Sequence, residues 1–368
     1  MKPLKIITIV GVRPQFIKAA AVSRAITKYN KSGSRPLIQE LYIHTGQHYD
    51  YEMSKVFFQE LKLLPKAAYH LGVGSGSQGF QTGEILKKTE GVLIKEKPDV
   101  VLVYGDANST LAGALTAAKI QIPIAHIEAG LRSFNRQMPE EINRLVADHL
   151  SAWLFCPSEQ AVKNLAKEGI RDGVHLVGDV MYEMFLLYLA KVQKEQKHLL
   201  ARYDLVSKSY ALVTVHRAEN TDEPLKLRSI FSALKRLARE KILVAIPLHP
   251  RTKKALKLAK ISLEGISVLP PVSYKEMLCL ETNAKIILTD SGGIQKEAYW
   301  FSVPCLTLRE ETEWVETLKT GWNRLVGSNS DKILRAASKI PSLKSHPPLY
   351  SNNQAAEKIV HYLSQSKL

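Results

Sequence analysis

The sequence has few of the features that mark a disulfide-rich, membrane-spanning or metal-binding protein. Its three cysteines, Cys156, Cys279 and Cys305, lie far apart and form no CxxC pair. We expect each to fill part of a core in a reducing cytoplasm, and we expect no metal site. No apolar run reaches the roughly 20 residues that a membrane-spanning helix needs. The start, MKPLKIITIVGVRPQ, is interrupted by Arg13 and predicts a first strand rather than a signal peptide.

Aromatic side chains and concentrated charge are also scarce. Aromatic residues make up 7% of the chain, and no block of five like charges occurs although the formal net charge is +16. Proteins that bind single-stranded nucleic acid interleave aromatic and basic residues, and this pattern is missing. Most of the dispersed lysines and arginines are typical of a solvated surface. The positive charge that such a surface does not explain favours an anionic small ligand over nucleic acid or a membrane.

What the chain does contain is a repeated strand–helix alternation. Its 368 residues suit two domains, and 45% hydrophobic with 23% charged residues is typical of a globular protein. Short apolar runs alternate with helical stretches, which indicates parallel sheets covered on both faces. The pattern restarts after a charged helical stretch at about 181–204. We therefore predict an α/β protein with two Rossmann-like domains, residues 1–180 and 181–352, and a C-terminal helix, 353–368, that packs back on the domains.

The predicted strands fall into two sets, one in each domain. The first set is 4–10, 41–45, 99–105, 123–127, 153–156 and 174–177. The second is 210–215, 242–248, 265–269, 284–289 and 304–308. In the first domain we predict helices at about 14–29, 51–62 and 108–120, and one that opens at residue 139.

Ligands of open α/β sheets bind beyond the carboxyl ends of the strands, so the residues there carry most information. After the first strand, GVRPQFIK places Arg13 and Lys18 near a helix N-terminus, which favours an anion. The alternative is two exposed basic residues. Asp106 and Glu128 follow two later strands and could converge. In the alternative reading, which needs no catalytic role, Asp106 is a helix N-cap and Glu128 forms a salt bridge.

The stretch MPEEINR carries another group of charges. Pro139 starts a helix, so Glu140 and Glu141 occupy its first turn, where the helix dipole stabilises negative charge. Glu140 and Arg144 are spaced i,i+4, as in a helical ion pair. Capping and pairing would explain these residues without catalysis.

In the second half, HRAEN and IPLHPR place His216 and His249 just past strands. The segment DSGGIQKEA puts a Ser-Gly-Gly loop, residues 291–293, between a strand and a helix, where backbone N–H groups can hold phosphate. Glu297, one turn into that helix, is placed to accept two ribose hydroxyls. The GxGxxG match at residues 74–79 follows no convincing strand, so we read it as a turn into a helix and predict no NAD.

Several of these motifs together resemble the non-hydrolysing UDP-N-acetylglucosamine 2-epimerases along nearly the whole chain. The matching stretches are GVRPQFIK, TGQH, YGDANSTLAGA, HIEAGLRS, MPEEINR, HRAEN and DSGGIQKEA. The resemblance implies a glycosyltransferase-B fold with the active site in the interdomain cleft. It implies a cytoplasmic homodimeric isomerase of polysaccharide biosynthesis that needs no metal or other cofactor. Such an enzyme inverts C2 of a UDP-linked 2-acetamido sugar by eliminating UDP and adding it back to a 2-acetamidoglucal.

The resemblance also assigns roles to individual residues. Asp106, Glu128 and Glu140 match the catalytic carboxylates, His216 a phosphate-side histidine and Arg144 an arginine of the cleft. The positions that match substrate-binding residues are Arg13, Lys18, Met277, Ser291, Gly292, Gly293 and Glu297.

This chain departs from the family pattern at several positions, three of them in its second half. Lys296 stands where many members carry glutamate, Trp314 where some carry arginine near the uridine pocket, and Met277 where some carry an aromatic residue. QKEA, EWVE and RSFNRQMPEEINR resemble the branch acting on UDP-2,3-diacetamido-2,3-dideoxy-glucuronate, so either this sugar or UDP-GlcNAc fits. The alternative functions are a hydrolysing UDP-sugar 2-epimerase and a glycosyltransferase of the same fold.

Overall fold

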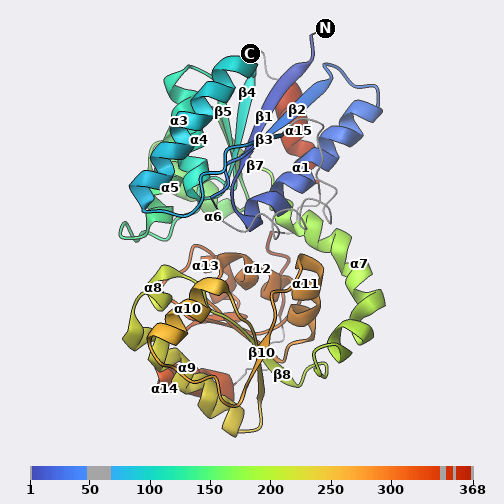
Figure 1. Cartoon of the computed structure of the whole chain (residues 1–368). Coiled ribbons are helices and arrows are strands. Elements are labelled where there is room, and N and C mark those ends of the chain that lie inside the picture. The colour runs from blue at the N-terminus through green and yellow to red at the C-terminus, as the bar shows by residue number, and fades with distance from the viewer. Residues whose placement is uncertain (1, 48–67, 340–344, 351–353, 366–368) are drawn as a thin grey trace. The chain divides into compact units, whose positions relative to one another are not determined.

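The structure is a computed structural model that describes residues 2–47, 68–339, 345–350 and 354–365. The chain forms two compact units, here called unit 1 (Met1–Met184 with Tyr350–Leu368) and unit 2 (Phe185–Leu349). Each unit has one parallel sheet with helices on both of its faces (Figure 1). Within the described residues, no helix combines the length and the apolar character needed to cross a membrane.

Unit 1 has a seven-stranded sheet in the order β3-β2-β1-β4-β5-β6-β7, with every pair parallel. Its strands are β1 (Leu4–Val10), β2 (Ile38–His44), β3 (Ala68–His70), β4 (Val100–Tyr104), β5 (Ile124–Ile127), β6 (Trp153–Cys156) and β7 (Val174–Leu176). Its helices are α1 (Arg13–Lys31), α3 (Gln78–Glu96), α4 (Asn108–Lys119), α5 (Pro139–Leu150), α6 (Glu159–Lys167) and α15 (Ala355–Gln365), and α7 (Val180–Ala201) leads into unit 2.

The core of unit 1 follows from the apolar strands. Residues of β1, β4 and β5 are fully buried, and they pack against small and branched side chains of α3, α4 and α5. The second face is covered by α1 and α15, which contact each other (Figure 1). Five buried side chains of α15 form its apolar stripe: Ala355, Ala356, Ile359, Val360 and Leu363.

Unit 2 has a six-stranded parallel sheet in the order β10-β9-β8-β11-β12-β13. Its strands are β8 (Tyr210–Thr214), β9 (Leu243–Pro247), β10 (Ile266–Leu269), β11 (Ile286–Thr289), β12 (Cys305–Thr307) and β13 (Asn323–Leu325). Its helices are α8 (Ala218–Thr221), α9 (Pro224–Arg239), α10 (Pro250–Leu258), α11 (Tyr274–Asn283), α12 (Gly292–Trp300), α13 (Val315–Lys319) and α14 (Ser330–Ser338).

The structure confirms the predicted α/β class with two parallel, Rossmann-like sheets. The predicted strands are all present, but β3 and β13, three residues each, were not anticipated. Because β3 precedes residues 74–79, the expectation that no strand leads to the GxGxxG match is wrong. The predicted helix at 51–62 lies outside the described residues.

Candidate active site

The switch point of unit 1 lies between β1 and β4, which are neighbours in the sheet although β2 and β3 intervene in the chain. Loops that leave neighbouring strands in opposite directions open a crevice at their carboxyl ends. Arg13 begins α1 directly after β1, and Asp106 follows β4. Glu128 follows β5, which pairs with β4. The predicted residues of unit 1 are therefore carried by adjacent loops of one sheet edge.

Lys18 and Glu128 form an ion pair beside Gly105. Both side chains are less than 10% exposed. Gly105 has φ +61°, and a Cβ there would lie 3.0 Å from Lys18 Nζ and 3.2 Å from Glu128 Oε2. A larger residue would press on both charged groups and strain the left-handed backbone, which glycine tolerates. The salt bridge that was the alternative reading of Glu128 is present, and its partner is the lysine that the resemblance assigns to UDP.

The backbone of Glu128 is also unusual. Its φ is +73°, a left-handed value that costs a non-glycine residue on the order of 1 kcal/mol. The N–H groups of Glu128 and Ala129 both donate to the carbonyl of Phe155 in β6, at 3.1 and 3.2 Å. Strained residues held by their surroundings are concentrated at functional sites. The strain therefore favours a functional role for this carboxylate.

Asp106 is held from one side by helix α5. Arg144 donates to Asp106 Oδ2 from Nη2 at 2.7 Å and from Nε at 3.1 Å, and Asn143 Nδ2 donates to the Asp106 carbonyl at 2.8 Å. The N-cap of α4 is Ala107, so the reading of Asp106 as an N-cap is wrong. The Asp106 side chain remains 35% exposed, which leaves part of the carboxylate accessible to a ligand.

The two glutamates that open α5 have different surroundings. Glu141 is buried and accepts from Ser133 N at 2.9 Å, from Ser133 Oγ at 3.0 Å and from Phe134 N at 2.9 Å. It also pairs with Arg144. Glu141 therefore fixes the loop that leads into α5. Glu140 lies next to it in the first turn and is half-buried.

Sequence reasoning missed Gln15, which ties two of these loops together. Its Oε1 accepts from Gly11 N at 2.7 Å, and its Nε2 donates to the Tyr104 carbonyl at 2.8 Å and to Thr110 Oγ1 at 2.9 Å. The loops after β1 and β4 are thereby joined through one buried amide. The sequence feature that could have identified Gln15 is its place at the third position of the predicted helix, where a glutamine side chain can cap the N-terminus.

In unit 2, Asp290 organises the loop after β8. This fully buried carboxylate accepts from the backbone N–H groups of His216 and Arg217 and from Asn220 Nδ2, all at 3.0–3.1 Å. Burial raises its pKa, but the nearby His216 ring and these donors outweigh burial and bring the pKa to about 2. His216 Nδ1 lies 3.1 Å from Asp290 Oδ1, so the ring is fixed at the end of β8.

The Ser-Gly-Gly loop forms the N-terminus of α12. Ser291 is the N-cap, and its side chain accepts from the Ile294 N–H. A Cβ on Gly292 would lie 2.4 Å from Glu313 Oε1, so a larger residue would have to displace the Glu313 carboxylate. N–H groups at such a helix start attract phosphate. Gly293 follows in the first turn, and Glu297 lies one turn further with a side chain that is 4% exposed.

Two of the positions that depart from the family pattern, Lys296 and Trp314, lie at this helix. Lys296 is fully buried, and its Nζ lies 4.0 Å from the centroid of the Trp314 ring and 5.7 Å from that of Trp300. Two of the departures are thus joined by a cation–π contact. Met277, the third, is buried in α11.

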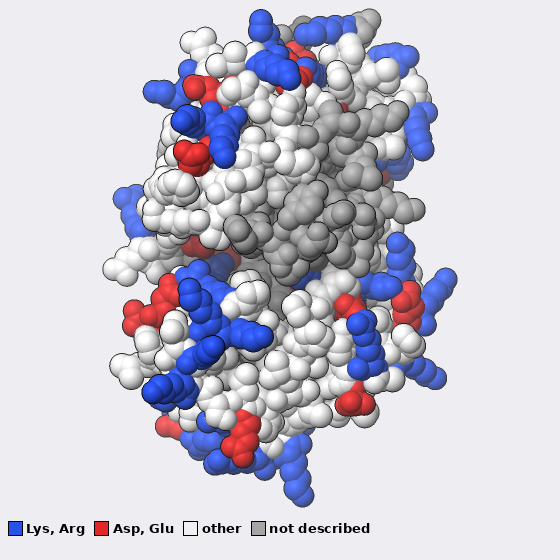
Figure 2. Space-filling model, in the orientation of Figure 1, with Lys and Arg blue, Asp and Glu red and all other residues white. Residues whose placement is uncertain are grey.

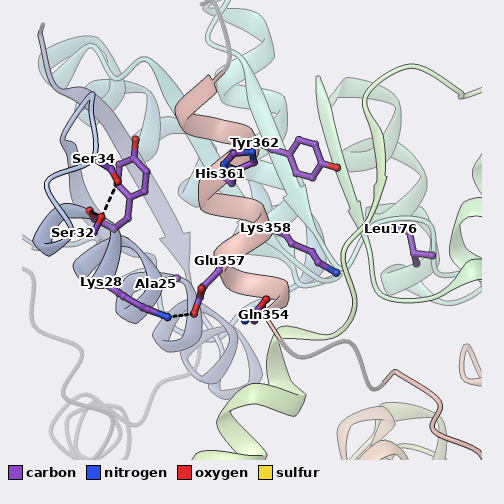
Figure 3. A pocket seen from close by; sticks show the side chains of 11 residues that line it. Ala25, Lys28, Ser32, Ser34, Leu176, Gln354, Glu357, Lys358, His361 and Tyr362 are labelled. Atoms are coloured by element: carbon purple, nitrogen blue, oxygen red, sulfur yellow. Dashed lines mark hydrogen bonds and ion pairs between the residues drawn. The ribbon is translucent and has the colours of Figure 1, made fainter.

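A cavity of about 650 Å³ lies elsewhere in unit 1, beside α1 and α15 (Figure 3). Lys28 of α1 and Glu357 of α15 form an ion pair on its wall, and Lys358, His361 and Tyr362 also line it. None of the predicted site residues lines this cavity, so we do not take it as the candidate site.

Charge on the visible surface is spread widely. Figure 2 shows Lys and Arg side chains over both units, with a group over α8 and α10 in unit 2. Arg251 of α10 pairs with Asp222, which follows α8, at 2.6 Å. Within the part of the chain that the structure describes, no group of three or more His, Cys, Asp and Glu side chains could hold a metal ion.

Known proteins resemble this chain in sequence and in fold. A family model described as UDP-N-acetylglucosamine 2-epimerase matches residues 30–364. The chain is 52% identical to a UDP-N-acetylglucosamine 2-epimerase homolog of Methanococcus maripaludis, over 98% of this chain and 99% of the relative. It is 46% identical to the UDP-2,3-diacetamido-2,3-dideoxy-D-glucuronate 2-epimerase of Pseudomonas aeruginosa, over 98% and 100%. The crystal structure of Methanocaldococcus jannaschii UDP-GlcNAc 2-epimerase with UDP-GlcNAc and UDP matches with a TM-score of 0.92 at 43% identity, covering 98% and 100%.

Proposed function

Because the chain belongs to the UDP-N-acetylglucosamine 2-epimerase family, we propose that it inverts C2 of its sugar by eliminating UDP and adding it back. The protein is an epimerase of UDP-linked 2-acetamido sugars with a glycosyltransferase-B-like fold of two parallel-sheet units. The mechanism and the roles of individual residues are our proposal.

The observation that carries the mechanism is the pair of carboxylates on adjacent strand ends of unit 1. Glu128 is paired with Lys18, and Asp106 is paired with Arg144. C2 of such a sugar has no neighbouring carbonyl, so its proton is not acidic, and it can be removed only as UDP departs from C1. That reaction needs proton-transfer groups on two faces of the sugar and cations near the departing charge.

The proposed reaction has two balanced steps. In the first, a carboxylate takes the C2 proton, the C–H electron pair forms the C1–C2 double bond, and the C1–O bond breaks with its electrons going to UDP. In the second, a carboxylic acid delivers a proton to C2 from the opposite face while a phosphate oxygen of UDP attacks C1. Asp106, Glu128 and Glu140 are the proton-transfer candidates, and Arg144 orients Asp106. The sugar is neither oxidised nor reduced overall.

We assign UDP binding mainly to unit 2. The N–H groups at Ser291, Gly292 and Gly293 and the His216 ring bind the diphosphate, Met277 packs at the nucleoside, and Glu297 accepts the ribose hydroxyls. Arg13 and Lys18 contribute positive charge from unit 1. This assignment is supported by the start of α12, where the positive end of the helix dipole is lined by glycine.

We expect Glu297→Ala to weaken UDP binding by about tenfold or more, because two hydrogen bonds to a charged group are lost. Isothermal titration calorimetry with UDP measures the change. Glu264→Ala is the matched control, since Glu264 is an exposed residue of the same unit. An unchanged dissociation constant in Glu297→Ala would remove this residue from the ribose site.

Proton NMR of the purified protein in D₂O, without added metal or NAD, tests the function. With UDP-GlcNAc we expect UDP-ManNAc carrying deuterium at C2. The same experiment with UDP-2,3-diacetamido-2,3-dideoxy-glucuronate identifies the preferred sugar. Release of free 2-acetamido sugar would instead establish the hydrolysing reaction, and no change with either substrate would contradict the proposed function.

The oligomeric state and the cellular location are further parts of the proposal. We propose a homodimer in the cytoplasm, acting in polysaccharide biosynthesis, as the resemblance implies. Light scattering on the purified protein measures the mass, and a monomer would contradict the homodimer.

A further inference from the structure

A fully buried histidine lies behind the carboxylates of unit 1. His126 belongs to β5, and its ring contacts two oxygen atoms. Its Nε2 lies 2.8 Å from the main-chain carbonyl of Gly105, and its Nδ1 lies 2.7 Å from Asp148 Oδ1. A carbonyl oxygen can only accept a hydrogen bond, so Nε2 must carry a proton.

The second ring nitrogen depends on the state of Asp148. The Oδ2 atom of Asp148 accepts from Arg132 Nη1 at 2.7 Å and from Gly130 N at 3.1 Å. These two donors, one of them the permanently charged guanidinium of Arg132, favour the ionised form of Asp148. An ionised carboxylate only accepts hydrogen bonds, so Nδ1 must also carry a proton.

We propose that His126 is a buried imidazolium that positions Asp106 and Glu128 for proton transfer. The ring donates to the carbonyl of Gly105, the residue before Asp106. Glu128 follows His126 by two residues, and its carboxylate lies against Gly105. One charged ring thus fixes the ends of β4 and β5 relative to each other. This inference rests on the proposed role of the two carboxylates.

The surrounding charges accommodate a cation at this position. Arg132 binds Glu168 through Nε and Nη2, both at 2.7 Å, as well as Asp148. The cluster therefore contains two anions, Asp148 and Glu168, and two cations, Arg132 and His126. Asp148 is fully buried and contacts both cations, whereas the Glu168 side chain is 24% exposed, so a charged ring makes the cluster neutral overall. The other titratable and charged groups around the cluster are Cys156 of β6 and, across Gly105, Lys18, Glu128 and Asp106 with its partner Arg144.

The protonation state can be measured without any substrate. In the full-length protein labelled with ¹⁵N-histidine, correlation spectra assigned through the His126 Cβ should show both ring nitrogens protonated at neutral pH. Both ring protons should exchange slowly with solvent, because the ring is buried. A ring nitrogen with the shift of an unprotonated imidazole would overturn the proposal whether or not any variant folds.

The kinetic test compares His126→Gln with His149→Gln. Glutamine keeps one donor but has no charge, whereas His149 is an exposed residue of α5. We expect His126→Gln to lower kcat by roughly 10²-fold with KM nearly unchanged, because the carboxylates are misplaced rather than removed. The acid limb of its pH–rate profile should move to higher pH, since the lost positive charge makes the nearby carboxylates easier to protonate.

The outcomes separate this inference from the function on which it rests. The His149→Gln control should behave as the wild type does. Epimerisation by the wild type together with an unchanged kcat and pH profile in His126→Gln would overturn the positioning role alone. A wild type that epimerises neither UDP-sugar would overturn the proposed function and with it the positioning role, while the NMR spectrum would still decide whether His126 is an imidazolium.

Discussion

Replacing Glu128 by glutamine should lower kcat by about 10³-fold or more, while UDP still binds. The amide has nearly the same shape as the carboxylate but cannot take or return the C2 proton, and positioned acid–base groups contribute about 10²–10⁴-fold to rate. Turnover is followed by NMR with the UDP-sugar that the wild type epimerises, and UDP binding by calorimetry. Glu159→Gln is the matched control, because Glu159 is 79% exposed on α6 of the same unit.

The variant needs a check of its fold, since Lys18 loses its charged partner. UDP binding, which we assign mainly to unit 2, would report damage to unit 1 only in part. Thermal unfolding followed by circular dichroism should therefore accompany the kinetics. Turnover of Glu128→Gln close to that of the wild type would remove Glu128 from the proton-transfer residues.

A second large effect is expected from Asp290→Asn, which should lower the free energy of unfolding by about 2 kcal/mol at pH 7. The pKa of Asp290 is about 2 in the folded protein against an ordinary value of 3.8, and one unit corresponds to about 1.4 kcal/mol. Because the folded pKa is lowered, the stabilisation is complete above pH 4 and is lost as the pH falls through about 2. Urea unfolding at pH 7 and near pH 3 measures the difference.

Tryptophan fluorescence suits this measurement, because unit 2 holds three of the four tryptophans: Trp300, Trp314 and Trp322. The control is Asp331→Asn, an exposed position of the same unit. The gap between the wild type and Asp290→Asn should be smaller near pH 3 than at pH 7. An equal gap at both pH values would mean that the carboxylate charge does not stabilise unit 2.

The sheets and the loops that carry the site could be predicted because the information is local. Apolar runs of four to seven residues mark β1, β4 and β5, and the polar residues just after them mark the crevice. The order of the strands then brings Asp106 and Glu128 to the same sheet edge. Strands β3 and β13 escaped prediction because three residues are too few to show a period.

The pairing of side chains could not be predicted, since it depends on contacts between distant segments. Lys18 of α1 pairs with Glu128, which follows β5. Arg144 of α5 pairs with Asp106, which follows β4. Helical spacing suggested Glu140 as a partner for Arg144, and the pair of Arg144 with Glu141 was not anticipated. Lys296 and Trp314 were noted as separate departures, and only the fold shows that they touch.

Unit 1 is built from two stretches of the chain that are far apart in the sequence, and this affects how the unit folds during synthesis. Helix α15, which packs against α1, is translated only after the whole of unit 2. A ribosome will therefore have released the strands of unit 1 while one apolar face of α1 is still uncovered. Domains generally fold as they emerge, but unit 1 can complete its packing only after α15 has been made. A premature stop codon just before α15 would thus damage the first-made unit and leave the later one whole.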